Sequence, residues 1–212
     1  MSEIVVRELA KNDLDAVSDV HIRAFEGRAL AALGHEAVRR YYHSQLTGPH
    51  DAIYLGAFQA DNLLGFCFAG VFRGSLSLFL RNHKWFLAWR VFTHPWLIFS
   101  SFFRERIILA LRVLKFVRAK AAASQQLAPS RVKSFGILAI AVDPGCQGAG
   151  VGKQLMQISE QIARQRGFTQ MHLTVDVKNV GAIRFYEGLA WQKVVASDGI
   201  WHGSMSKKMA GE

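Results

Sequence analysis

The stretch SFGILAIAVDPGCQGAGVGKQLM (134–156) decides the fold, because it combines a strand, a glycine-rich turn and the start of a helix. Residues 134–142 are uninterruptedly apolar over the length of a strand, which is typical of the centre of a sheet. Apolar residues then recur at helical spacing from Val151 to Ile162. The first amides of a helix lack intrahelical partners and its dipole favours negative charge there. With Lys153 beside them, these amides form a candidate phosphate site, while a ligand-free tight connection remains the alternative.

Two common nucleotide motifs do not fit this turn. A phosphate-binding G-x-x-x-x-G-K-[ST] loop needs a hydroxyl after its lysine, whereas Gln154 follows Lys153 here. The dinucleotide fingerprint opens a first strand–helix unit and is followed by an acid at a strand end, whereas this turn comes late in the chain.

The turn resembles the acetyl-coenzyme A motif of the GNAT superfamily of N-acyltransferases. The core of that motif, Q-x-x-G-x-G, is met by Gln147, Gly150 and Gly152. The next block, VDVKNVGAIRFYEGLAW (175–191), resembles the second signature of the same superfamily. The two signatures stand in the right order, and the resemblance covers residues 134–191.

The resemblance implies an α/β (α+β) fold of GNAT type, with a mixed, mostly antiparallel central sheet flanked by helices. It implies a single domain over residues 1–212 that carries a helical insertion, residues 73–133, after the third strand. The implied activity is transfer of an acetyl group from acetyl-coenzyme A to a primary amine without a metal. A small-molecule acceptor such as an amino sugar is favoured, because residues 21–42 resemble GNAT proteins of surface-polysaccharide and amino-sugar pathways. The alternatives are a protein or peptide amine, and a non-catalytic acyl-coenzyme A-binding or membrane-docking module.

Site residues carry over from the superfamily by position. The backbone of the central strand would pair with the pantetheine arm, the loop and first helical amides would hold the pyrophosphate, and Asn179 would contact the cofactor near its thiol end. Tyr186 would protonate the leaving thiolate. The remaining cofactor-binding residues are Ile140, Ala141 and Val142 on the strand, and Gln147, Gly148, Ala149, Gly150, Val151, Gly152 and Lys153 in the turn.

The chemistry of acyl transfer supports Tyr186 and leaves the base open. A phenol with a pKa of about 10 stays protonated at neutral pH and can donate to a thiolate. The alternative for Tyr186 is an aromatic filler between helix and sheet, and for Asn179 a plain helix cap. The central strand has no acid, so the candidate bases are Asp176, Glu26 and His21, or a backbone carbonyl with water.

The positive charge is concentrated in the middle of the chain. The whole sequence carries +10, but residues 71–133 hold 12 Lys or Arg against one acid, Glu105, which is a net +11. The same segment holds eight of the 15 Phe and three of the five Trp. The remaining residues are nearly neutral, so the basic, aromatic segment needs an explanation of its own.

Three interpretations of residues 73–133 stay open. The segment is a helical lid over an anionic substrate such as a nucleotide sugar, a surface that rests on an anionic membrane, or a solvated basic face that completes the core. Nucleic acid is disfavoured as a partner because the segment is too apolar, and a homodimer is a further candidate. The 13-residue run 91–103 lacks charge but is shorter than the roughly 20 residues of a membrane span. The amino terminus lacks the apolar run of a signal peptide, so a cytoplasmic location is expected, with membrane association at the cytoplasmic face as the variant.

The rest of the chain is expected to alternate strands and helices. Cys67 and Cys146 are too few for a disulfide framework or a four-ligand zinc site. Strands are expected at 3–9, 53–58, 63–72, 171–177, 191–196 and 203–209, and helices at 14–25 after an Asn12 or Asp13 cap, at 35–46, at 104–118 and at 179–187.

Overall fold

A computed structural model describes residues 3–93 and 135–209. Its contacts divide the chain into two compact units. The first unit consists of Met1–Leu9, His50–Phe72 and Arg131–Glu212, and the second of Ala10–Pro49 and Arg73–Ser130. Of the insertion expected at 73–133, residues 94–133 lie outside the described residues, as does the helix expected at 104–118.

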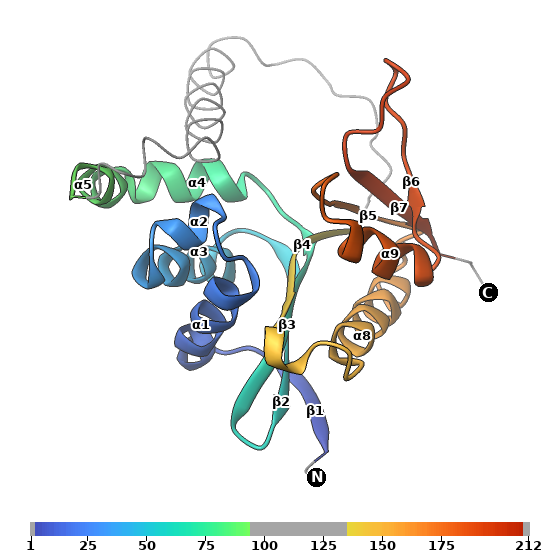
Figure 1. Cartoon of the computed structure of the whole chain (residues 1–212), viewed down its shortest axis with the longest axis horizontal. Helices are drawn as coiled ribbons and strands as arrows, with labels where there is room; N and C mark the ends of the chain where they lie inside the picture. Colours follow the sequence, from blue (N-terminus) through green and yellow to red (C-terminus); the bar gives the residue numbers. More distant parts are fainter. Residues whose placement is uncertain (1–2, 94–134, 210–212) are drawn as a thin grey trace. The chain divides into compact units, whose positions relative to one another are not determined.

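The first unit is built on a seven-stranded sheet (Figure 1). Its strands follow the order β1-β2-β3-β4-β5-β7-β6, and every neighbouring pair is antiparallel except β4 and β5. This confirms the expected mixed, mostly antiparallel sheet with the apolar run 134–142 at its centre. The strands are β1 (Ile4–Glu8), β2 (Asp51–Gln59), β3 (Asn62–Val71), β4 (Phe135–Val142), β5 (Gln170–Thr174), β6 (Gln192–Lys193) and β7 (Ser204–Lys208).

Two helices complete the first unit, α8 (Val151–Gln165) and α9 (Val180–Gly188). Helix α8 packs against β2, β3 and β4. Its apolar stripe explains this position, because Val151, Leu155 and Ala163 are buried in the core that also contains Phe135 of β4. The helix ends at Gln165, and Gly167 just beyond it has a φ of +74°, the left-handed conformation that glycine adopts most easily.

An ion pair with a buried carboxylate links α8 to β7 near one edge of the sheet. The Glu160 carboxylate is only 7% exposed and lies 2.7 Å from Nζ of Lys207 on β7. The indole Nε1 of Trp191, just after α9, donates to the other carboxylate oxygen at 3.2 Å. Both oxygens of a buried charge are thereby satisfied, as a low-dielectric interior requires.

The second unit is helical where the structure describes it. Helix α1 packs against α3, α3 against α4, and α4 against α5. The two expected helices, at 14–25 and 35–46, are confirmed. Asp13 stands at the N-cap of α1, one of the two expected positions, but its carboxylate accepts from the Ala10 amide in the preceding 3-10 turn and makes no capping bond to α1. The helices are α1 (Leu14–Ala24), α2 (Ala29–Ala32), α3 (His35–Thr47), α4 (Ser75–Asn82) and α5 (Lys84–Thr93).

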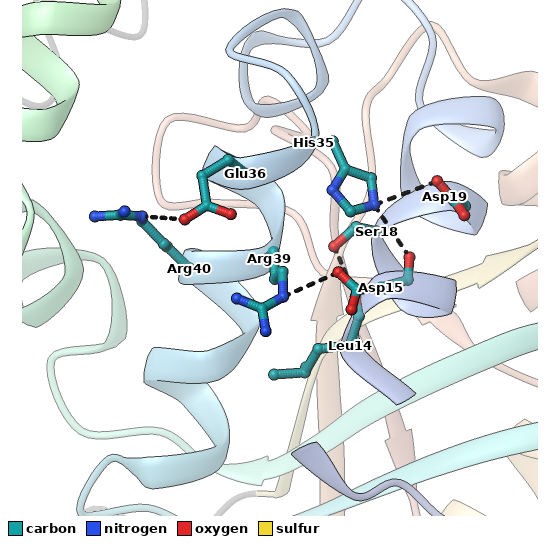
Figure 2. A network of polar contacts seen from close by, with 8 residues as sticks. All are labelled: Leu14, Asp15, Ser18, Asp19, His35, Glu36, Arg39 and Arg40. Carbon is teal, nitrogen blue, oxygen red and sulfur yellow. Dashed lines mark hydrogen bonds and ion pairs between the residues drawn. The ribbon is translucent and has the colours of Figure 1, made fainter. Parts of the chain in front are cut away.

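Exposed polar contacts link α1 to α3 (Figure 2). Nε of Arg39 lies 2.9 Å from the Asp15 carboxylate, and Nε2 of His35 lies 3.3 Å from that of Asp19. Such exposed pairs contribute at most about 1 kcal/mol each, so they orient the two helices more than they stabilise them.

The core between α1 and α3 contains a buried histidine. Nδ1 of His21 is hydrogen-bonded to the Tyr42 hydroxyl at 2.9 Å, and the Phe25 ring lies 4.6 Å from the imidazole, centroid to centroid. Nε2 of His21 is buried and has no hydrogen-bond partner in the described part of the chain. Burial lowers the pKa of His21 to about 4, so the ring is neutral at pH 7.

Candidate active site

The central feature of the first unit is an edge of β4 that lacks a partner strand. Pairing between β4 and β5 is limited to Phe135↔Met171 and Gly136↔His172. Beyond Gly136, the described residues of β4 pair only with β3, while β5 continues beside β7. The amides and carbonyls that β4 directs away from β3 are therefore available to a ligand. This is the strand separation that the resemblance implies, and the three predicted strand residues lie along it.

A β-bulge lies at the start of this edge. The pairs Ala69↔Ile137 and Phe68↔Ala139 leave Leu138 as an extra residue in β4. An extra residue reverses the alternation of side chains, so Ile137 and Ile140 both pack against the α8 core. The bulge thus keeps β4 anchored by apolar side chains while its backbone changes direction.

The turn after β4 is stabilised by its own acid. The Asp143 carboxylate accepts from the Gly145 amide at 3.0 Å, and its carbonyl accepts from the Cys146 amide at 2.8 Å. The following residues, from Gln147 to Gly150, are exposed. Asp143 therefore shapes the loop, and the amides beyond it face solvent.

Gly148 and Gly150 are required by their backbone conformation. Their φ angles are +83° and +82°, which L side chains rarely adopt, and no heavy atom would lie within 4 Å of a Cβ at either position. The space above both residues is open, so a ligand can approach their backbone closely.

Gly152 lies at a close contact between two helices. A Cβ there would lie 3.3 Å from Cζ of Phe185 and 3.5 Å from Cγ2 of Val142. Glycine at this position thus lets α9 pack closely against the start of α8, and the predicted contact of the Gly152 amide with a pyrophosphate stays a prediction.

The first turn of α8 presents donors without acceptors. Gly150 is the N-cap, and no side chain caps the helix. The first intrahelical bond runs from the Gln154 amide to the Gly150 carbonyl, which leaves the amides of Val151, Gly152 and Lys153 directed towards the loop. No acid stands in this turn, and Lys153 is exposed. The predicted residues 147–153 are thus brought together as a positively polarised site for an anion.

Tyr186 lies on the buried face of α9. Its ring is 8% exposed and packs near Phe185 and Trp191, and no described residue hydrogen-bonds its hydroxyl. Burial, followed by the nearby Cys67 thiol, raises the pKa of Tyr186 above its usual value. The phenol therefore stays protonated across the physiological range and retains a proton to donate.

Asn179 caps α9, as the simpler interpretation expected. Its Oδ1 accepts from the Ala182 amide at 3.1 Å, and the residue is exposed. The cap uses the oxygen of the amide, and the predicted contact of Asn179 with a cofactor stays a prediction.

Two of the three expected base candidates are hydrogen-bonded within the fold, and the third is exposed on the surface. Asp176 accepts from the Lys178 amide at 2.9 Å in a turn after β5. Glu26 is exposed beyond the end of α1, and His21 is bonded to Tyr42. Asp176 belongs to the first unit, whereas Glu26 and His21 belong to the second.

The sequence did not point to His172, which pairs with Gly136 in the last β4–β5 pair. A Cβ on Gly136 would lie 2.7 Å from Nε2 of His172, so the imidazole covers bare glycine backbone. Burial lowers the pKa of His172, which keeps the ring neutral at pH 7. The sequence shows a histidine in one strand and a glycine in another. Only the register of the two strands shows that they lie opposite each other.

Both cysteines are free thiols. Cys67 is fully buried, receives a hydrogen bond from Ser159 at 3.4 Å, and has a pKa raised by burial to about 12. Cys146 is half-buried in the loop. Within residues 3–93 and 135–209, no group of three His, Cys, Asp or Glu could hold a metal ion.

Comparisons with known proteins agree with this architecture. The model of the acetyltransferase (GNAT) family matches residues 14–191. Among solved structures, the chain is similar to the PaiA N-acetyltransferase from Thermoplasma acidophilum in complex with coenzyme A, with 15% identity and a TM-score of 0.56 over 97% of this chain and 99% of that one. It is also similar to a GNAT family acetyltransferase from Brucella melitensis in complex with acetyl-CoA, with 12% identity and a TM-score of 0.53 over 100% and 92%.

Curated relatives match over shorter segments. A mycothiol acetyltransferase of Streptosporangium roseum is 39% identical over 57 residues, which are 27% of this chain and 17% of that protein. The N-acetyltransferase family 8 member 2 of Rattus norvegicus is 30% identical over 83 residues, which are 39% of this chain and 35% of that protein. The chain thus spans about a third or less of the length of the curated relatives it matches.

Proposed function

Because the chain belongs to the acetyltransferase (GNAT) family, we propose that it transfers an acetyl group from acetyl-coenzyme A to the primary amine of a small molecule such as an amino sugar. One observation carries the proposal: the edge of β4 without a partner strand leads directly into the anion site at the start of α8. A ligand with an extended polar arm and a pyrophosphate matches both parts. The preference for an amino sugar rests on the resemblance of residues 21–42 to proteins of amino-sugar pathways.

The donor would bind along β4 and the loop. The backbone of Ile140, Ala141 and Val142 would pair with the arm in the manner of an added strand. The amides from Gln147 to Lys153 would hold the pyrophosphate, with the Lys153 ammonium beside it. The bound donor supplies the acetyl thioester. Glycine at 148 and 150 permits this close approach, since both positions are open and require positive φ.

We assign the two proton transfers to Tyr186 and His172. Tyr186 would donate its phenolic proton to the sulfur of the departing thiolate, because burial keeps the hydroxyl protonated. An arm that runs from Val142 towards Ile140 points to the end of the free edge, where His172 covers Gly136. His172, neutral at pH 7, would take the proton that the amine loses as the amide forms.

Binding is tested first, by thermal melts with and without acetyl-coenzyme A. At about 100 times its dissociation constant a ligand stabilises the native state by about 2.7 kcal/mol, or about 5–10 °C for a chain of this size. Gly150→Glu should abolish the shift, because it adds a carboxylate at the anion site. Gly167→Glu is the matched control: it also places a side chain at positive φ in open space, but at the other end of α8. If both variants show the same shift in melting temperature, the pyrophosphate does not bind at this loop.

The acceptor is tested by release of free thiol with a panel of amines. The panel contains an amino sugar, a nucleotide-linked amino sugar, and peptides with a free α-amine or a lysine. Turnover with the sugars and none with the peptides is expected. Turnover with the peptides and none with the sugars would leave the proposed donor site intact and would identify the acceptor as a peptide or protein amine.

A further inference from the structure

Helix α5 of the second unit carries three aromatic side chains that are exposed to solvent. Trp85, Trp89 and Phe92 are 79%, 65% and 77% exposed, more than any other large apolar side chain in the described part of the chain. Their spacing of four and three residues places them on one face of the helix. Large exposed aromatics in a contiguous stripe are unusual on a soluble surface and indicate a binding surface.

An adjoining face of α5 is fastened within the same unit. The Arg40 guanidinium of α3 lies 4.2 Å above the centre of the Phe86 ring. Nε of Arg90 donates to the Leu33 carbonyl at 2.8 Å, and the Arg90 guanidinium lies against Gly34. These contacts fix the rotation of α5 about its axis and leave the aromatic face exposed.

The surroundings of the aromatic face are cationic. Arg81 and Lys84 are exposed at its amino-terminal side, and Nζ of Lys84 lies 5.5 Å from the Trp85 ring centre. The sequence contains no Asp or Glu between Asp61 and Glu105, so no acid along this stretch offsets the positive charge. Trp and Phe beside basic residues are the composition of helices that lie in the interface of an anionic membrane.

We propose that the outward face of α5, formed by Trp85, Trp89 and Phe92 with Lys84 at its edge, docks on an anionic lipid surface. The helix would lie in the plane of the headgroups, with the aromatic rings below them and the ammonium at their level. The ten described residues of α5 span about 15 Å, which is about half the thickness of the hydrocarbon core of a bilayer. In the described residues, no helix has the length and apolarity to span a membrane. The docking does not depend on the acetyltransferase activity.

Vesicle flotation of the full chain tests the docking. The protein should float with vesicles of phosphatidylcholine containing about 30% phosphatidylglycerol at low salt, bind much less at high salt, and stay unbound with phosphatidylcholine alone. The triple variant Trp85→Ser, Trp89→Ser, Phe92→Ser should bind at least about tenfold more weakly. A matched control replaces three other exposed apolar residues, Val194, Val195 and Ile200, by Ser and should bind like the parent.

Two further readouts separate other occupants of the face. If a second copy of the chain or residues 94–134 cover it, the triple variant changes the mass in light scattering or lowers the melting temperature, and the parent does not float. If single-stranded nucleic acid is the partner, the parent binds an oligonucleotide and ignores the vesicles. Either result overturns the proposal, as does equal floating of the parent and the triple variant.

Discussion

The buried imidazole of His21 predicts how the stability of the protein depends on pH. Its pKa is about 4 in the folded protein against an ordinary value of 6.5, because burial excludes the charged form and Nε2 has no partner in the described residues to receive it. Between pH 4 and pH 6.5, His21 is protonated in the unfolded chain and neutral in the folded protein. Stability is therefore fully present above pH 6.5 and falls as the pH drops towards 4.

The size of the effect follows from the shift. A difference of about 2.5 pKa units corresponds to about 3.4 kcal/mol once the pH is below both values. At pH 5 the same linkage gives a loss of about 2 kcal/mol relative to pH 7.5. This is a substantial part of the stability of an ordinary domain.

Urea unfolding at pH 7.5 and pH 5 measures the effect in the parent and in His21→Leu. The parent should lose about 2 kcal/mol more than the variant, because leucine removes the titrating group and keeps an apolar side chain between α1 and α3. His202→Leu is the control, since His202 is exposed and should leave the loss at His21 unchanged. Equal losses in the parent and His21→Leu would refute the assignment.

Three further outcomes are expected. Tyr186→Phe should lower kcat by a factor of about 10²–10⁴, because the proton donor is lost. The melting temperature and its shift with acetyl-coenzyme A should stay the same, because no described residue bonds the hydroxyl. A lower melting temperature with intact kcat would contradict the role of Tyr186. Lys207→Met should cost about 3–5 kcal/mol in urea unfolding, since it leaves the Glu160 carboxylate buried without its cation, whereas the exposed neighbour Lys208→Met should change stability by less than about 0.5 kcal/mol. In the parent, kcat/KM should fall as the pH drops through the pKa of His172, below 6.5, and His172→Gln should be slower and lack this decline; an unchanged pH profile would exclude His172 as the base.

Much of the first unit was predictable because its signals are local. A continuous apolar run predicted β4, and the apolar period of 3.6 residues after Gly150 predicted α8. The cap at Asn179 was equally predictable, since Asn favours the turn before a helix. In each case, residues close in the sequence determine the structure.

What the sequence did not reveal depends on register. The bulge at Leu138 and the pairing of Gly136 with His172 arise from contacts between distant segments, which no local pattern encodes. For the same reason the sequence did not show that His172 lies against Gly136 or that Gly152 packs against the Phe185 ring. Asp13 is the N-cap of α1, one of the two predicted positions, but its carboxylate bonds backwards to the Ala10 amide, because an Asp side chain can bond to backbone on either side of it.

The unpaired length of β4 also bears on solubility. Exposed strand edges are templates for cross-β association, and proteins usually end them with short strands, charges or bulges. Here the unpaired amides of β4 lie in the interior of a seven-stranded sheet. On one side β4 pairs with β3, and on the other side its backbone is unpaired beyond Gly136. A bound ligand that pairs with this row would cover the edge, so it should lower the tendency of the protein to associate through β4.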